Sequence, residues 1–108
     1  MGLRHVFGDK PIPKLLDFML VHRHWDYPIS ELENATGVSY RTLQNVIPKL
    51  VKNTILTETR TVGNAKFYSI NVNSDSVKKL DAFAVQADLD FGVKSSAVKA
   101  KFPIPARS

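Results

Sequence analysis

The chain has no cysteine among its 108 residues, which excludes disulfide bonds and thiolate metal sites. No apolar run approaches the roughly 20 residues that a membrane-spanning helix needs. The N-terminal residues lack the long apolar stretch of a signal peptide, so we expect a cytoplasmic protein. The composition is 44% hydrophobic and 23% charged, as in ordinary globular proteins, and the length suits one domain with a modest core.

Motifs for catalysis and metal binding are scarce. A glycine-rich phosphate loop, a nucleophile motif and a spaced pair of carboxylates are all missing from the sequence, so nothing favours an enzyme or a cofactor. His22, His24 and Asp26 could suggest a metal site, but without cysteines or a second cluster of ligands we expect none. Trp25 and Tyr27 could form a platform for a ligand; we expect them instead to close one end of the core.

Positive charge is concentrated in two segments of a chain whose formal net charge is +5. Residues 37–72 contain five lysines and arginines and a single acidic residue, Glu58, while residues 92–108 contain four basic residues and no acidic one. The rest of the chain is slightly acidic. A basic sector of this kind is typical of a surface that binds a polyanion, although solvated lysines without a partner explain it equally well.

Apolar spacing and capping residues predict three helices in the first half of the chain. The first follows Asp9, whose side chain can cap it, and ends near Arg23. Ser30 and Glu33 form a capping box that starts a short second helix, and Gly37 suits its left-handed C-terminal cap. Ser39 caps the third helix, whose apolar stripe consists of Leu43, Val46, Ile47, Leu50 and Val51.

The opposite stripe of the third helix is polar and contains no acidic residue. Pro48 lies on this stripe and should bend the helix, and Asn53 can supply a left-handed exit. Two β-rich runs, residues 55–62 and 65–72, flank the turn residues Gly63 and Asn64 and predict a tight hairpin.

A final helix is expected over about residues 75–91, capped by Ser74 or Asp75. Ile29 could form a short bridge with a later strand. Residues 1–91 would then form the domain, and the basic tail of residues 92–108, which has no regular period, is expected to be mobile or loosely docked.

The predicted order is helix, helix, glycine turn, helix, hairpin, helix. When Ile29 is taken as the first position of a helix-turn-helix frame, apolar residues and glycine occupy the positions that two crossing helices bury, namely Leu32, Gly37, Val38, Leu43 and Val46. Residues 29–43 resemble the second helix, turn and recognition-helix entry of the winged helix-turn-helix family of transcription regulators, especially compact archaeal and bacterial ones. Residues 62–71 resemble the wing of that family.

The resemblance covers residues 12–72 and implies an α+β fold, with a three-helix core, a two-stranded β-hairpin wing and a C-terminal helix. Three positions depart from the pattern. Glu33 stands where many of these frames have alanine, Thr54 stands where glycine often ends the recognition helix, and Pro48 lies inside that helix.

In this family the N-terminal half of the third helix enters the major groove of DNA. Carried over to this chain, the candidates for contacts with base edges are Tyr40, Arg41, Gln44 and Asn45. The candidates for phosphate contacts are Ser39, Thr42, Lys49 and Lys52. The wing would reach the flanking backbone or minor groove through Arg60, Asn64 and Lys66.

The resemblance implies a sequence-specific regulator that binds double-stranded DNA and acts by occupying a promoter. Two alternatives stay open, a winged-helix protein-interaction module of transcription or replication machinery and a sequence-neutral architectural DNA binder. We expect a homodimer through the apolar stripe of the final helix, which holds Val77, Leu80, Ala84 and Ala87. The competing arrangement folds this helix back onto the first helix, with Phe83 and Phe91 completing the core.

Overall fold

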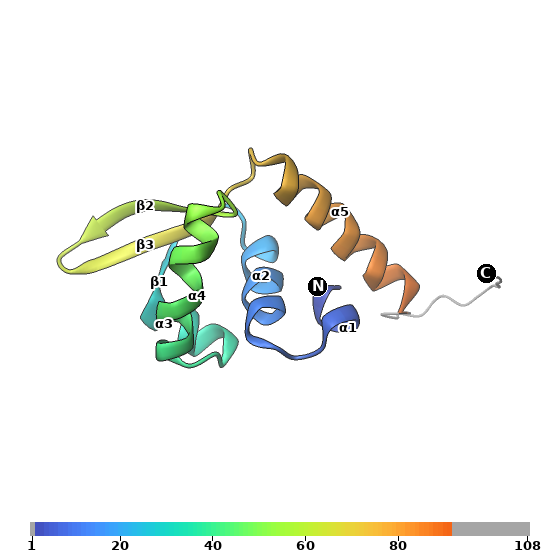
Figure 1. The fold of residues 1–108 in the computed structure, drawn as a ribbon, viewed down its shortest axis with the longest axis horizontal. Coiled ribbons are helices and arrows are strands. Elements are labelled where there is room, and N and C mark those ends of the chain that lie inside the picture. Colours follow the sequence, from blue (N-terminus) through green and yellow to red (C-terminus); the bar gives the residue numbers. More distant parts are fainter. Residues whose placement is uncertain (1, 92–108) are drawn as a thin grey trace.

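A computed structural model describes residues 2–91, and the tail predicted over residues 92–108 lies outside the described part. The described chain is α+β, with five helices and one three-stranded antiparallel sheet. The helices are α1 (Leu3–Phe7), α2 (Pro11–Val21), α3 (Ile29–Thr36), α4 (Tyr40–Lys52) and α5 (Asp75–Asp90), and the strands are β1 (Tyr27–Pro28), β2 (Leu56–Val62) and β3 (Ala65–Ile70). Figure 1 shows α3 and α4 beside the sheet, α2 in the middle and α5 reaching across to α1. This arrangement is compatible with a winged helix.

The sheet has the strand order β1-β3-β2, so the expected hairpin gains a third strand. The bridge expected at Ile29 forms at the two residues before it, where Tyr27 pairs with Tyr68 and Pro28 pairs with Phe67. Proline is tolerated in β1 because this strand lies at the edge of the sheet. The hairpin turns at Gly63, whose φ of 63° is the positive value that a type II′ turn requires at its first central residue.

The core lies where α2, α3 and α4 meet the sheet. Leu15, Leu32, Leu43 and Ile47 are completely buried. Of the five positions in the helix-turn-helix frame, Leu32, Val38 and Leu43 are buried, Val46 is half-buried, and Gly37 has the expected left-handed conformation at φ 78° and ψ 3°. The frame predicted from the sequence therefore describes how α3 and α4 pack.

Two of the predicted helix starts are wrong. Asp9 does not cap α2, because its carboxylate accepts a hydrogen bond from Arg4 Nε at 2.7 Å. The capping box of Ser30 and Glu33 does not form either, because Ile29 is already helical and Ser30 therefore lies inside α3. Glu33 Oε2 instead accepts the amide hydrogen of Tyr40 at 3.1 Å, which places its negative charge at the N-terminus of α4.

The start of α4 is as predicted, since Ser39 Oγ accepts the amide hydrogen of Thr42. The helix continues through Pro48 to Lys52. Its exit differs from the prediction, because Asn53 has φ −90° and Thr54 takes the left-handed conformation with φ 63°. The Thr54 amide donates to the Val51 carbonyl at 3.0 Å and the next amide donates to Leu50 at 2.9 Å, which is the Schellman pattern.

Helix α1 was not predicted, and it packs against α5, where Gly2 at its start lies beside Ala84 and Ala87 of the stripe that was expected to form a dimer. Val77, Ala84 and Ala87 are buried within the chain, and Leu80 is half-buried. The dimer face predicted from the sequence is therefore wrong. The competing arrangement is right that α5 folds back, but its main partner is α1. Phe83 and Phe91 stay 44% and 58% exposed rather than completing the core.

Candidate nucleic-acid interface

One face of α4 is polar, exposed and free of acidic residues. It carries Arg41, Gln44, Asn45, Lys49 and Lys52, whose side chains are all exposed. The hydrogen bonds and ion pairs within residues 2–91 involve none of these five side chains. The opposite face buries Leu43 and Ile47 completely, which fixes the rotation of the helix. All donors and acceptors of the exposed face are therefore available to a ligand.

The first turn of α4 is occupied by groups of the chain itself. Ser39 Oγ caps the helix and lies 2.9 Å from Thr42 Oγ1, and the carboxylate of Glu33 binds the Tyr40 amide. Ser39 and Thr42, both predicted to contact phosphates, are thus used in capping. An anion that approaches α4 would meet its side chains rather than a free helix end.

Arg60, predicted to contact DNA from the hairpin, binds another part of the chain. Its Nε and Nη2 atoms donate to the Asp26 carboxylate at 3.0 and 3.2 Å, and its guanidinium carbon lies 4.3 Å from the centre of the Phe67 ring. Thr59 also donates to Asp26, and these hydrogen bonds, first from Thr59 and then from Arg60, lower the pKa of that carboxyl. These contacts hold the Arg60 guanidinium group against Asp26 and Phe67.

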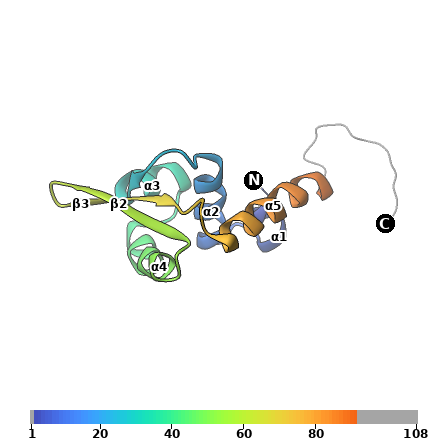
Figure 2. The ribbon, with the colours of Figure 1, turned by 90° about the horizontal axis from the view of Figure 1, so that it is seen from above.

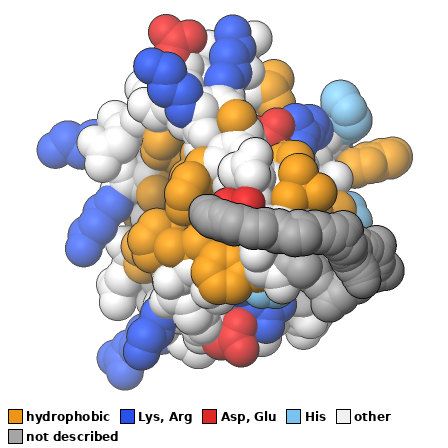
Figure 3. Space-filling view, turned by 90° about the vertical axis from the view of Figure 1, so that its right-hand side faces the viewer, with side chains coloured by type: hydrophobic (Ala, Val, Ile, Leu, Met, Phe, Trp, Pro, Cys, Tyr) orange, Lys and Arg blue, Asp and Glu red, His pale blue; other side chains and the backbone are white. Residues whose placement is uncertain are grey.

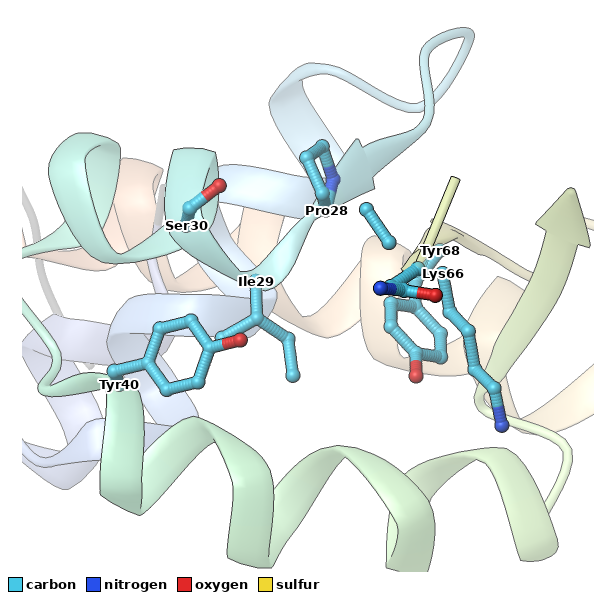
Figure 4. A pocket seen from close by; sticks show the side chains of 8 residues that line it. Pro28, Ile29, Ser30, Tyr40, Lys66 and Tyr68 are labelled. Carbon is cyan, nitrogen blue, oxygen red and sulfur yellow. The ribbon is translucent and has the colours of Figure 1, made fainter. Parts of the chain in front are cut away.

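A cleft of about 160 Å³ lies between the start of α4, the start of α3 and the hairpin (Figure 4). It brings together three predicted site residues, Tyr40, Asn64 and Lys66. It also contains Ser30 and Tyr68, which were not predicted as site residues. Figure 4 shows Tyr40 reaching in from the start of α4, with Tyr68 and Lys66 on the other side. The alternation of apolar and polar residues along β3 predicts that Tyr68 lies in a strand. It does not predict which side chains Tyr68 faces.

The aromatic residues in β1 and in the segment before it differ in their contacts. Tyr27 is half-buried, and its ring centre lies 5.2 Å from that of Phe18. His22 joins this cluster, with its ring centre 4.4 Å from Phe18. Trp25 is 66% exposed, so the prediction that it closes the core is wrong for this residue. Within residues 2–91, no three side chains of the metal-binding types come together.

A second surface feature lies at the opposite end of the molecule. Figure 3 shows apolar side chains gathered at the end that carries α1 and α5. The exposed apolar residues there include Phe7, Phe83, Leu89 and Phe91, and Phe7 and Phe83 contact each other with ring centres 6.2 Å apart. An apolar groove of about 550 Å³ between the α1–α2 connection, α4 and Leu80 adjoins them.

Comparisons with protein-family models, with curated proteins and with solved structures give no match for this chain. Among the helices of residues 2–91, none has the length and apolar character needed to cross a membrane.

Proposed function

We propose that this chain is a winged helix-turn-helix protein that binds double-stranded DNA sequence-specifically and regulates transcription in the cytoplasm by occupying a promoter, without catalysis. The observation that carries the proposal is the exposed, acid-free face of α4, whose polar side chains have no partner among the described residues. Figure 2 shows α4 standing out from one side of the molecule, with the hairpin extending beyond the helices. A DNA major groove about 12 Å wide admits one such helix.

Three exposed side chains of α4 match the edges of base pairs. The Arg41 guanidinium can donate two hydrogen bonds to guanine, and the carboxamides of Gln44 and Asn45 can each bind the donor and acceptor of adenine. Because these groups bind nothing within the described chain, contact with DNA would break no internal hydrogen bond. Lys49 and Lys52 lie nearer the C-terminal end of the helix and would neutralise phosphates, which adds affinity without reading sequence.

The β2–β3 hairpin would serve as the wing. Asn64 lies at its exposed turn, and Lys66 is exposed beside Glu58, with 4.0 Å between the Lys66 ammonium nitrogen and the carboxylate. Arg60 is left out of the proposed contacts because Asp26 binds its guanidinium group. The wing would therefore contact DNA with fewer charges than the sequence predicted.

A homodimer remains part of the proposal, because two copies double the length of the DNA site. It cannot use Val77, Ala84 and Ala87, which are buried within the chain. The exposed apolar side chains of α5, among them Val85 and Leu89, would have to make the contact. The same apolar end favours a second candidate function, a protein-interaction module, in which this end rather than α4 binds the partner.

Selection of bound sites from a random duplex library tests the proposal. We expect enrichment of one sequence, arranged as an inverted repeat if the protein is a dimer. The double variant Arg41→Ala, Gln44→Ala should enrich no sequence. A Leu89→Asp variant should still prefer the sequence of one half of the inverted repeat. Equal retention of random and selected duplexes by the wild type would favour an architectural binder, and no retention at low salt would leave the interaction module.

A further inference from the structure

The cleft between α4 and the hairpin is lined by a tyrosine hydroxyl group that has no hydrogen-bond partner among the described residues. Tyr68 is only 8% exposed, and its side chain lines the cleft. None of the hydrogen bonds within residues 2–91 includes the Tyr68 hydroxyl group. A hydroxyl group without a protein partner can donate its hydrogen to a ligand that enters the cleft, so an acceptor atom of the ligand would gain a hydrogen bond there.

The polar side chains that line the cleft around this hydroxyl group can donate, and the Glu58 carboxylate on the neighbouring strand lies 4.0 Å from the Lys66 ammonium group. Tyr40, Ser30 and Lys66 line the cleft with two hydroxyl groups and an ammonium group, and Asn64 adds an amide. Figure 4 shows the polar ends of Tyr68 and Lys66 pointing the same way, toward the side of α4. Burial, followed by the nearby Glu58 carboxylate and Tyr40, raises the pKa of the Tyr68 hydroxyl, so this group stays protonated as a donor.

The two helix starts beside the cleft differ in their capping. Ser39 and Glu33 occupy the N-terminus of α4. No side chain caps the N-terminus of α3, and its first residues, Ile29 and Ser30, line the cleft. The uncapped amides and the positive end of the helix dipole favour an anion at the start of α3. The volume of about 160 Å³ equals roughly five water molecules, which is enough for a phosphate group.

We propose that this cleft binds one phosphate group of the DNA backbone, held by the hydroxyl groups of Tyr68 and Tyr40 and by the Lys66 ammonium group. The inference rests on the proposed DNA binding and goes beyond it. It moves Tyr40 from the base-reading set to the phosphate-binding set and adds Tyr68, a residue of the sheet. The bound phosphate would fix the register of α4 in the groove, because phosphate contacts position a protein on the duplex.

Removing the Tyr68 hydroxyl group tests the inference, with Tyr27→Phe as the matched control on the neighbouring strand. Tyr68→Phe should weaken binding to the selected duplex about 3- to 10-fold, the range expected for one hydrogen bond, while the melting temperature stays unchanged or rises. Tyr27→Phe should leave the affinity unchanged. A lower melting temperature with unchanged affinity would show that the hydroxyl group is structural and would overturn the inference.

Duplexes with a single neutral methylphosphonate linkage identify the phosphate. A neutral linkage at one position of the duplex should weaken binding by the wild type but should not weaken binding by the Tyr68→Phe variant any further. Equal losses of affinity at every position for both proteins would overturn the inference. If the wild type binds no duplex, the proposed function fails. Titration with inorganic phosphate, followed by the NMR signals of Ser30 and Asn64, then tests the cleft alone. If phosphate shifts these signals in the wild type but not in the Tyr68→Phe variant, the cleft binds free phosphate. If the signals of the wild type do not change, the site is rejected.

Discussion

The two carboxylate oxygens of Asp81 on α5 accept hydrogen bonds from the guanidinium group of Arg23, at 2.8 and 3.0 Å. Arg23 Nε also donates to the Leu20 carbonyl at 3.0 Å, so the same side chain binds the end of α2 and the side of α5. These two residues lie 58 positions apart, and each side chain is about one-third exposed or less. The pair therefore connects α5 to the end of α2.

Replacing Arg23 with methionine keeps most of the side-chain packing and removes the hydrogen bonds. We expect the free energy of unfolding to fall by about 1 kcal/mol, because a partly exposed bidentate pair is only partly screened by solvent. Arg4→Met is the matched control, since the Arg4–Asp9 pair is more exposed, and it should change stability little. Denaturant unfolding measures both; equal losses in the two variants would show that the Arg23 pair does not hold α5.

Gly2 is in contact with α5, and a side chain at this position should displace α1. A Cβ atom on Gly2 would collide with the Ala84 carbonyl oxygen. We expect Gly2→Ala to lower the free energy of unfolding by about 1–3 kcal/mol, as overpacking does. Val6→Ala, on the exposed side of the same helix, should have a smaller effect. A Gly2→Ala variant as stable as the wild type would contradict the packing of α1 on α5.

Local signals predicted the frame but not this packing. Gly37, Ser39 and Ser74 cap helices as their positions in the sequence indicate, because a cap involves only neighbouring residues. Helix α1 has only five residues, too few for a period, and its amides at Leu3 and Arg4 are capped by the Asp17 carboxylate from α2, at 3.0 and 2.9 Å. A partner 14 residues away leaves no local pattern.

Part of the candidate site could likewise be predicted from local sequence patterns, and part of it could not. The exposed stripe of α4 follows from helical periodicity, so its residues could be named from the sequence. The pairing of Arg60 with Asp26 could not be predicted, because the two residues lie 34 positions apart in the sequence. Tyr68 was missed because the alternation of a strand predicts burial but does not show that its hydroxyl group would lie opposite Tyr40 across a cleft.

Thr54 should be a site where glycine stabilises the protein. It is the one non-glycine residue of the described chain with positive φ, at 63°, and β-branched residues are strained in that conformation. We expect Thr54→Gly to raise the free energy of unfolding by about 1 kcal/mol, because the strain is relieved. Asn53→Gly, at φ −90°, should not stabilise. Thermal unfolding of the two variants compares these positions, and a destabilised Thr54→Gly would argue against the left-handed exit of α4.

The contact between Asp26 and Arg60 should contribute less to the stability of the protein at acidic pH. Hydrogen bonds from Thr59 and Arg60 lower the pKa of the Asp26 carboxyl below its ordinary value of 3.8. A carboxyl with a lowered folded-state pKa contributes stability above its unfolded-state pKa and loses it as the pH falls through the folded-state value. The stability difference between wild type and Asp26→Asn should therefore be constant above about pH 5 and shrink on acidification. A difference that is independent of pH would contradict the contact.

Substitutions on the exposed face of α4 and at Arg60 should have opposite effects on DNA discrimination and on stability. Arg41→Ala and Gln44→Ala should each cost roughly 1–3 kcal/mol of discrimination between the selected duplex and random DNA, because each removes a contact with a base edge. They should change stability little, since neither side chain has a partner among the described residues. Arg60→Ala should lower stability and leave discrimination unchanged, because its guanidinium group binds Asp26.

Competition binding and denaturant unfolding, carried out on the same three variants, measure these two quantities separately. The salt dependence of binding adds a third readout, because each phosphate contact contributes about 0.9 to the slope of log affinity against log salt. Arg60→Ala should keep the wild-type slope, whereas Lys66→Gln should reduce it by about one. If Arg60→Ala reduces the slope and Arg41→Ala leaves discrimination intact, the hairpin rather than α4 binds the DNA.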